Sequence, residues 1–175
     1  MSETAPRTSS RRGVDGAALR AAMGHFATGV TIVTAAADGV PSGGTANAVT
    51  SLSLSPPLAL VCLREGSLTL ATLLRARSFA FNVLGRDQEP LALRFAAPGG
   101  PPAARFDGVG WQAGESGAPL LDGVVATVEC ALHDVAEGGD HRVVIGRVLA
   151  VRHPPHHAPP LVFHRGRFTG LDAAA

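Results

Sequence analysis

One stretch without a charged side chain is the basis for predicting the structure of the first half of the chain. It belongs to the uncharged run between Gly39 and Leu63 and reads Gly44-Thr-Ala-Asn-Ala-Val-Thr-Ser-Leu-Ser-Leu-Ser-Pro-Pro57. Side chains on a β-strand alternate between its two faces. Read as one strand, the stretch has an apolar face with Ala46, Ala48, Leu52 and Leu54. Its other face carries neutral hydrogen-bonding groups, namely Thr45, Asn47, Ser51, Ser53 and Ser55.

A polar but uncharged face of this kind can bind a planar heterocycle. The carbonyl and ring-nitrogen edges of such a ring need neutral donors and acceptors. Gly43 and Gly44 would let the ring approach the backbone closely. The same composition also fits an ordinary strand with a solvated Ser/Thr face, so the stretch alone leaves both interpretations open.

Strand signals dominate the sequence around this stretch. Val30 to Ala35 is strand-like, and Asp38-Gly39 is a turn signal that predicts a hairpin with the run starting at Thr45. Further strands are predicted at Leu58–Leu63, Ser78–Leu84, Gly123–Val135, His141–Val151 and Leu161–Phe168, with a turn over Glu137–Asp140.

Helix signals are fewer. Asp15 is a candidate N-cap for a helix that ends near Gly29, and Ser67 for a helix that runs through Arg75. Asp87 is a candidate cap for a third helix, with Pro90 in its first turn and Pro98–Pro102 beyond its end. Because helices do not alternate regularly with strands, the pattern favours a mainly β fold, a β-barrel with peripheral helices, over a doubly wound βαβ sheet.

Length and charge limit the organisation and the partners. The 175 residues suit one domain over residues 14–175, preceded by a disordered tail over residues 1–13. The net charge of +1 gives no reason to expect nucleic acid or an anionic membrane as partner. Cys62 and Cys130 lie in apolar runs, and the N-terminus has no apolar signal region, so we expect a reducing, cytoplasmic location.

Several ordered motifs resemble those of the flavin reductase-like family, the reductase components of two-component flavin monooxygenases. They are Phe26–Thr34, Gly44–Pro57, Phe79–Leu84, Phe106–Trp111, Gly117–Leu121, Gly139–His141 and Pro160–Phe163, and the likeness covers about residues 17–170. The resemblance implies a split β-barrel of the FMN-binding type, usually dimeric, that binds FMN or FAD. At Asn47-Ala48 this chain departs from the Ser-Ser common in the family, and Ser55 replaces a common acidic residue.

The resemblance also implies a set of cofactor-binding residues. In the uncharged stretch these are Thr45, Ala46, Asn47, Ala48, Ser51, Leu52 and Ser53. Outside it, Asn82 is expected at the flavin, and Phe95 and Phe168 are expected to cover the ring. From the residues themselves, Asn82 could equally be a turn former and the two phenylalanines plain core.

A phosphate site is predicted after the Leu58–Leu63 strand. Arg64, Ser67 and Thr69 stand at the start of a predicted helix, where hydroxyls, free backbone N–H groups and a guanidinium can bind a phosphate. An N-cap next to a surface arginine would look the same in the sequence.

His141 is the candidate catalytic residue. The family resemblance places this histidine of Gly139-Asp140-His141 beside the nicotinamide, where an imidazole can bind the dinucleotide or assist protonation of reduced flavin. Four other histidines, His153, His156, His157 and His164, have no zinc-like spacing, so no metal is expected.

The expected function is hydride transfer from NADH or NADPH to FMN or FAD. No Rossmann or P-loop motif is present, so the nicotinamide would stack directly on the flavin. The implied partners are a second copy of the chain and a monooxygenase that receives reduced flavin. Two alternatives stay open: a split-barrel oxidase or oxygenase that keeps its flavin for its own substrate, and a non-catalytic flavin- or haem-binding module.

Overall fold

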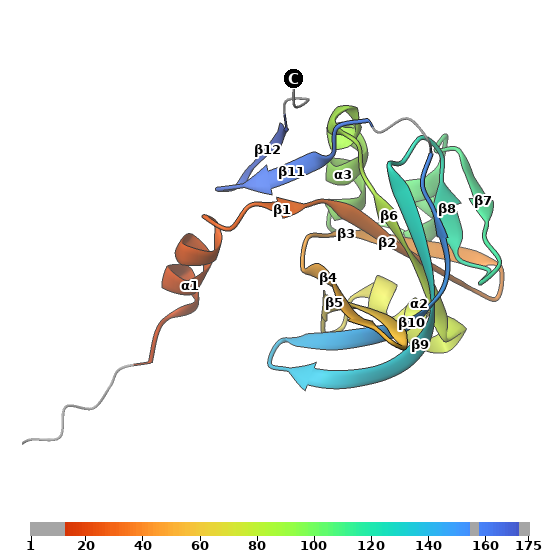
Figure 1. The fold of residues 1–175 in the computed structure, drawn as a ribbon, viewed down its shortest axis with the longest axis horizontal. Helices are drawn as coiled ribbons and strands as arrows, with labels where there is room; N and C mark the ends of the chain where they lie inside the picture. Colours follow the sequence, from red (N-terminus) through yellow and green to blue (C-terminus); the bar gives the residue numbers. More distant parts are fainter. Residues whose placement is uncertain (1–12, 155–157, 172–175) are drawn as a thin grey trace, which may run out of the picture.

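The computed structural model describes residues 13–154 and 158–171. Its elements, in chain order, are α1 (Gly16–Met23), β1 (Thr28–Gly29), β2 (Thr31–Ala37), β3 (Val40–Ala46), β4 (Val49–Leu54), β5 (Pro57–Arg64), α2 (Leu68–Ala76), β6 (Ser78–Val83), η1 (Arg86–Gln88), α3 (Glu89–Ala96), η2 (Pro102–Phe106), β7 (Trp111–Ala113), β8 (Pro119–Leu121), β9 (Ala126–Gly138), β10 (His141–Arg152), β11 (Leu161–His164) and β12 (Arg167–Gly170). The η elements are 3₁₀ helices. The mainly β fold with peripheral helices is confirmed (Figure 1).

The main sheet of the described residues has seven antiparallel strands in the order β3-β2-β6-β9-β10-β5-β4. Its two edge strands, β3 and β4, are consecutive in the chain, and only Asn47 and Ala48 separate them. A link of two residues spans at most about 11 Å, so the sheet must curl until its edges nearly meet. The Cys62 N–H donates to the Ala48 oxygen at 3.0 Å and fixes the link against β5. This near-closure is the split of the barrel.

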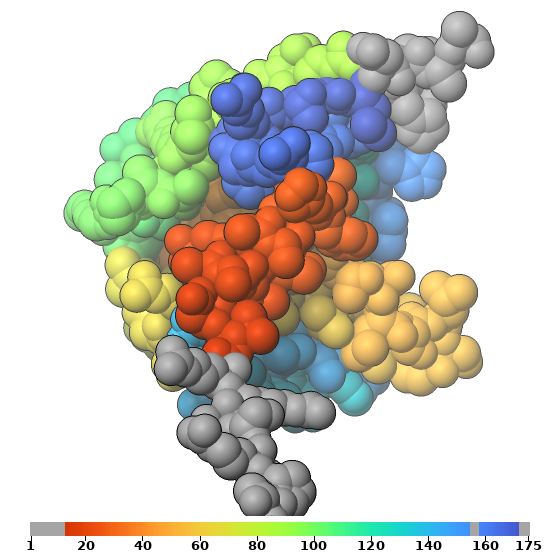
Figure 2. Space-filling view, turned by 90° about the vertical axis from the view of Figure 1, so that its left-hand side faces the viewer, coloured from red at the N-terminus to blue at the C-terminus, as the bar shows by residue number. Residues whose placement is uncertain are grey.

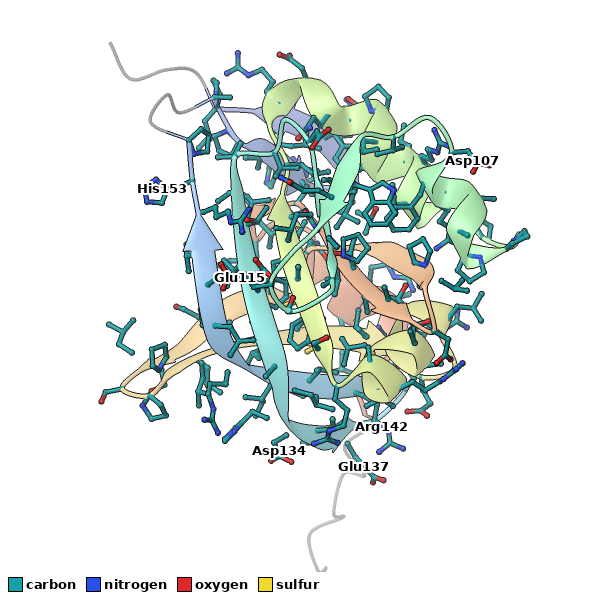
Figure 3. All side chains as sticks on the ribbon, turned by 90° about the vertical axis from the view of Figure 1, so that its right-hand side faces the viewer. Asp107, Glu115, Asp134, Glu137, Arg142 and His153 are labelled. Atoms are coloured by element: carbon teal, nitrogen blue, oxygen red, sulfur yellow. The ribbon has the colours of Figure 1, made fainter. Side chains whose placement is uncertain are left out.

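The barrel interior is filled by side chains from both the sheet and α2. Val33, Val61, Phe79 and Val144 point inward from four strands, and Leu70 and Leu73 enter from α2. Ile32, the neighbour of Val33, instead faces a second cluster that lies under α3, η2 and β8, as the strand period requires. Figure 3 shows side chains filling both layers. α2 thus closes the barrel, and α3 covers the outside.

Local signals fixed several boundaries. Asp15 caps α1 by accepting the Ala18 N–H at 2.7 Å, and Ser67 caps α2 by accepting the Leu70 N–H at 3.3 Å. Asp38 and Gly39 both have positive φ, at 53° and 74°, and turn the chain from β2 into β3. These three predictions are confirmed.

Other expectations were wrong in detail. The stretch 44–57 is not one strand, because the chain leaves one sheet edge after Ala46 and joins the other at Val49, and β3 begins at Val40 rather than Thr45. α1 ends at Met23, short of Gly29. Gln88, not Asp87, precedes α3, because its side chain accepts the Gly85 N–H and forms a 3₁₀ turn first.

The C-terminal half also differs from its prediction in places. Residues 161–168 contain two strands, since Arg165 and Gly166 form a turn with positive φ between β11 and β12. These strands join β1 in a small sheet of their own. β7 and β8 were not predicted as strands, and β9 begins at Ala126 rather than Gly123. The predicted tail, residues 1–13, lies outside the described residues apart from Gly13.

No helix of the described residues is long and apolar enough to cross a membrane.

Candidate functional site

A cavity of about 520 Å³ lies at the split of the barrel. We call it the split cavity. It is bounded by the end of β3 and the link to β4, by the end of β5 and the start of α2, and by the C-terminal end of α3. Its lining consists of Gly44, Thr45, Ala46, Asn47, Ala48, Cys62, Leu63, Arg64, Ser67, Leu68, Thr69, Phe95, Ala96, Ala97, Pro98, Gly99, Arg105 and His141.

The β3 wall of the split cavity is uncharged and held by its own hydrogen bonds. The Thr45 hydroxyl donates to the Ala92 oxygen at 2.6 Å, which ties β3 to α3. The Asn47 amide donates to the Thr28 hydroxyl at 3.2 Å. A Cβ at Gly44 would lie 3.0 Å from the Thr69 hydroxyl, so glycine keeps this wall close to α2. The wall therefore presents backbone and small neutral groups in fixed positions.

The α2 wall offers groups that bind anions. Thr69 is only 4% exposed, and its hydroxyl makes no hydrogen bond within the described residues although the side chain lines the cavity. Arg64 lies beside it and has no carboxylate within ion-pair distance in the described part of the chain. The N-terminus of α2 contributes free N–H groups and a favourable dipole. Together these groups suit a phosphate.

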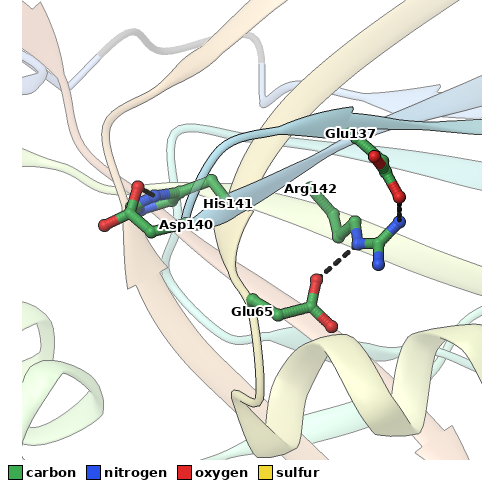
Figure 4. A network of polar contacts seen from close by, with 5 residues as sticks. All are labelled: Glu65, Glu137, Asp140, His141 and Arg142. Carbon is green, nitrogen blue, oxygen red and sulfur yellow. Dashed lines mark hydrogen bonds and ion pairs between the residues drawn. The ribbon is translucent and has the colours of Figure 1, made fainter.

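His141 lies at the mouth of the split cavity, at the first position of β10. Its Cα partner across the ladder is Arg64 of β5. The His141 Nδ1 lies 2.8 Å from the Asp140 Oδ1, as Figure 4 shows. Hydrogen bonding and charge from His141 lower the pKa of Asp140 below its ordinary value. With Nδ1 paired to the carboxylate, Nε2 is the nitrogen left for a ligand.

A second contact holds the turn that carries His141. Arg142 bonds the Glu65 carboxylate and lies 3.4 Å from a Glu137 oxygen, and the Glu65 N–H donates to the Asp140 oxygen at 3.0 Å (Figure 4). Glu65 raises the pKa of Arg142 through a hydrogen bond and its charge. Figure 3 shows Glu137 and Arg142 together at this end of the β9–β10 hairpin. The His141 turn and the Arg64–Ser67 loop are thus joined.

The structure brings nine of the predicted site residues to the split cavity. They are Thr45, Ala46, Asn47, Ala48, Arg64, Ser67, Thr69, Phe95 and His141. They come from four segments of the sequence, at residues 45–48, 64–69, 95 and 141. Their roles toward a flavin remain predictions.

Five predicted residues lie elsewhere. Ser51, Leu52 and Ser53 belong to β4, which forms a hairpin with β5, and they are not part of the cavity lining. Asn82 is fully buried and already satisfied, because its amide donates to the Ile32 oxygen at 3.1 Å and its oxygen accepts the Leu121 N–H at 2.8 Å. Phe168 stands on β12 with its ring 5.3 Å from that of Phe163. Resemblance to the family assigned these positions, and for Ser51 and Ser53 the alternating polar pattern of the stretch 44–57 also favoured them.

Sequence reasoning missed three parts of the lining. Arg105 comes from η2, a 3₁₀ helix that has no periodic pattern to announce it. The segment Ala96–Gly99 was read only as the end of a helix. Cys62 was read as a buried apolar residue, whereas it is half-buried and lines the split cavity.

An apolar groove adjoins the split cavity and shares Asn47, Ala48 and Cys62 with it. Met23, Phe26, Val49, Leu60 and Phe163 line it. Figure 2 looks onto the face that carries α1, with the β11–β12 hairpin directly above it. Exposed apolar side chains gather here and on the β4 hairpin, with Phe26 at 67% and Leu54 at 89% exposure.

Within the described residues, no three His, Cys, Asp or Glu side chains come close enough to hold a metal ion. His156 and His157 lie outside the described residues.

The sequence that forms this fold and cavity matches a known protein family. The model of the flavin reductase like domain matches residues 23–172. This chain belongs to the flavin reductase-like family. The resemblance of its motifs is thereby confirmed.

Individual relatives agree with this membership. The reductase component of the 4-nitrophenol 4-monooxygenase/4-nitrocatechol 2-monooxygenase of Rhodococcus opacus is 44% identical over 155 residues, which cover 89% of this chain and 80% of that protein. A probable flavin reductase of Rhizobium meliloti is 47% identical over 137 residues, 78% of this chain but only 43% of that protein's length. Our flavin reductase-like chain thus corresponds to less than half of that relative.

The fold of this chain is also similar to that of a solved structure. The NADH:FAD oxidoreductase of Streptomyces globisporus, in complex with NAD and FAD fragments, superposes with a TM-score of 0.85 at 41% identity. The match covers 92% of this chain and 95% of that one. The split-barrel fold of this flavin reductase-like chain is therefore shown.

Proposed function

We propose that the chain is an NAD(P)H-dependent flavin reductase that binds FMN or FAD in the split cavity and releases reduced flavin to a monooxygenase. Membership of the flavin reductase-like family gives the reaction class, hydride transfer between a nicotinamide and a flavin. The observation that assigns the site is the split cavity itself. Within it, an uncharged wall, an anion-binding wall and His141 face one space.

The residues present fit a flavin nucleotide. The β3 wall provides backbone and neutral side-chain groups for the polar edge of a ring, and Gly44 allows close approach. The Thr69 hydroxyl lines the cavity and has no protein partner in the described chain, so it is free to bond a ligand. Arg64 and the N-terminus of α2 supply the positive potential that a phosphate needs.

The protein's contribution to the chemistry is positioning and electrostatics. When bound, the flavin supplies the hydride-accepting ring nitrogen. The β3 wall and its link hold one face of the site, and His141 at the mouth orients the incoming dinucleotide or holds a proton at Nε2. Asp140 keeps the imidazole oriented through Nδ1, and Arg142 holds the turn to the Arg64–Ser67 loop. These roles need no covalent nucleophile.

We further propose that two copies associate through the face that carries α1 and the β4 hairpin. The exposed apolar side chains of Met23, Phe26, Leu52 and Leu54 support this, because such a concentration is typical of an interface. Cys62 and Cys130 are both free thiols, which supports a reducing cytoplasmic compartment.

A steady-state assay tests the proposed function. Purified protein is mixed with NADH or NADPH, with FMN, FAD or no flavin, and oxidation of the nicotinamide is followed by absorbance. Oxidation of the nicotinamide is expected only when flavin is added, and without oxygen one flavin is expected to be reduced for each nicotinamide oxidised. A protein that retains flavin through purification but does not oxidise either nicotinamide would instead be a binding module, and the proposal would be wrong.

A further inference from the structure

The split cavity is lined by a second arginine, Arg105, which comes from a different element than Arg64. Arg105 lines the cavity from η2, beside the residues that follow α3. Its Nη1 donates to the Gly43 oxygen at 2.9 Å and its Nη2 to the Ala97 oxygen at 2.6 Å. These bonds hold the guanidinium between β3 and the end of α3. The charge is therefore fixed in place at the cavity wall.

This positive charge has no acidic partner among the described residues. Arg105 makes no ion pair within the described residues, and no Asp or Glu lines the split cavity. A guanidinium has five N–H donors, and two carbonyl oxygens use only part of them. Asp107, the nearest acid along the chain, lies at the outer edge of the molecule in Figure 3. Arg105 thus keeps both charge and donors for a ligand.

Backbone groups beside Arg105 are also available. Gly99 lines the cavity, and Gly99 and Gly100 both have positive φ, at 79° and 76°. Neither N–H makes a hydrogen bond within the described chain, and the space around both Cα atoms is open. Free N–H groups in a glycine turn next to a guanidinium form the kind of concave site that binds phosphate oxygens.

Arg105 bonds Gly43 and the Thr69 hydroxyl lies against Gly44, so the two anion-binding groups flank neighbouring residues of β3 and suit the adjacent phosphates of a pyrophosphate better than a single phosphate. FMN carries a single phosphate, and the proposed phosphate site at Arg64, Ser67 and Thr69 would suffice for it. We infer that Arg105 and the Gly99 turn bind the second, adenylate-side phosphate of FAD, so that this end of the split cavity makes the enzyme select FAD over FMN. This inference depends on the proposed function, because it assumes that a flavin nucleotide occupies the cavity.

The test compares FAD and FMN affinities of Arg105→Gln with those of unmodified protein, by quenching of flavin fluorescence. Gln keeps a donor for a carbonyl but removes the charge. Unmodified protein is expected to bind FAD more tightly than FMN. The substitution should weaken FAD binding about tenfold and leave FMN binding within about threefold, because one charged hydrogen-bonding group is lost. A purely structural role would weaken both flavins equally.

Arg94→Gln is the matched control. Arg94 also anchors η2, through the Ala104 oxygen at 3.2 Å and the Asp107 oxygen, but it does not line the cavity. The Arg94→Gln substitution should leave the ratio of FAD affinity to FMN affinity unchanged. Three results would each overturn the inference. Unmodified protein could bind FAD and FMN equally, Arg105→Gln could weaken both flavins equally, or Arg105→Gln could raise the KM for NADH and leave FAD binding intact. The last result would assign Arg105 to the dinucleotide donor. Failure of unmodified protein to bind any flavin would overturn the proposed function as well.

Discussion

His141 and Arg64 are Cα partners on the neighbouring strands β10 and β5, and both side chains line the split cavity. The pairing places the candidate group for the nicotinamide next to the candidate group for the flavin phosphate. Strand register is fixed wherever one face of a sheet is buried, so this proximity is a property of the fold rather than of a mobile loop. Asp140 and Arg142, on either side of His141, hold the turn in place.

His141→Ala is expected to lower kcat/KM for the nicotinamide at least about tenfold, because an oriented imidazole is lost from the mouth of the cavity. Flavin affinity should change little. His133→Ala is the control, since His133 is exposed on β9 and does not line the cavity. Steady-state kinetics with each nicotinamide check this. Unchanged kinetics would remove His141 from the proposed site.

Ser67→Ala combined with Thr69→Ala is expected to weaken FMN binding about tenfold or more, because two hydroxyls are lost from the phosphate wall. Riboflavin, which has no phosphate, provides the control ligand, and its affinity should stay within about threefold. Titration of flavin fluorescence gives the dissociation constants of FMN and riboflavin for the variant and for the unmodified protein. An equal loss for riboflavin and FMN would mean that the substitutions disturb the fold, and unchanged FMN affinity would exclude the phosphate role.

Cys62 should be protected from alkylation by bound flavin, because it lines the split cavity. Cys130 is the internal control. Burial, and to a lesser extent the Glu129 carboxylate, raise the pKa of the Cys130 thiol to about 12, so it stays protonated and unreactive at pH 8. Mass spectrometry after iodoacetamide treatment should find Cys62 labelled in the free protein and spared with FAD present. Labelling of Cys62 at the same rate with saturating FAD would contradict this prediction and would mean that reagent reaches the thiol from the groove beside Met23 and Phe26, which Cys62 also lines.

The Asp140–His141 contact should be lost at acid pH, when the Asp140 carboxylate takes up a proton. The pKa of Asp140 is lowered from its ordinary value of 3.8 by His141, so the contact is present above about pH 4 and is lost as pH falls through the lowered value. Titration of the Asp140 carboxyl carbon by NMR should give a midpoint below 3.8. In His141→Ala the midpoint should return toward 3.8. Identical midpoints in the two proteins would show that His141 does not act on Asp140.

Several caps and turns of the fold could be predicted from the local sequence. Asp15 and Ser67 are N-caps because their side chains accept N–H groups within the same turn, and Asp38-Gly39 turns because its residues tolerate positive φ. The interruption between β3 and β4 at Asn47-Ala48 could not be predicted from the local sequence. It follows from the curling of seven strands, a long-range event that leaves no mark on the alternating pattern of the stretch 44–57.

The candidate site shows the same division. Arg64, Ser67 and Thr69 were found together because they are neighbours at a helix start. Arg105 was missed because it reaches the cavity only through the packing of η2 against β3, with Gly43 as its partner. Asn82 was expected at the flavin, yet its side chain is used within the core, where it bonds backbone groups of β2 and β8.

The location of the flavin is the central claim, and a crystal structure of the protein with FAD tests it most directly. Density for the ring is expected in the split cavity against Gly44 to Ala48, with a phosphate at Ser67 and Thr69 and the open face of the ring toward His141. Density for the ring in the adjoining apolar groove, beside Phe26 and Phe163, would contradict the account.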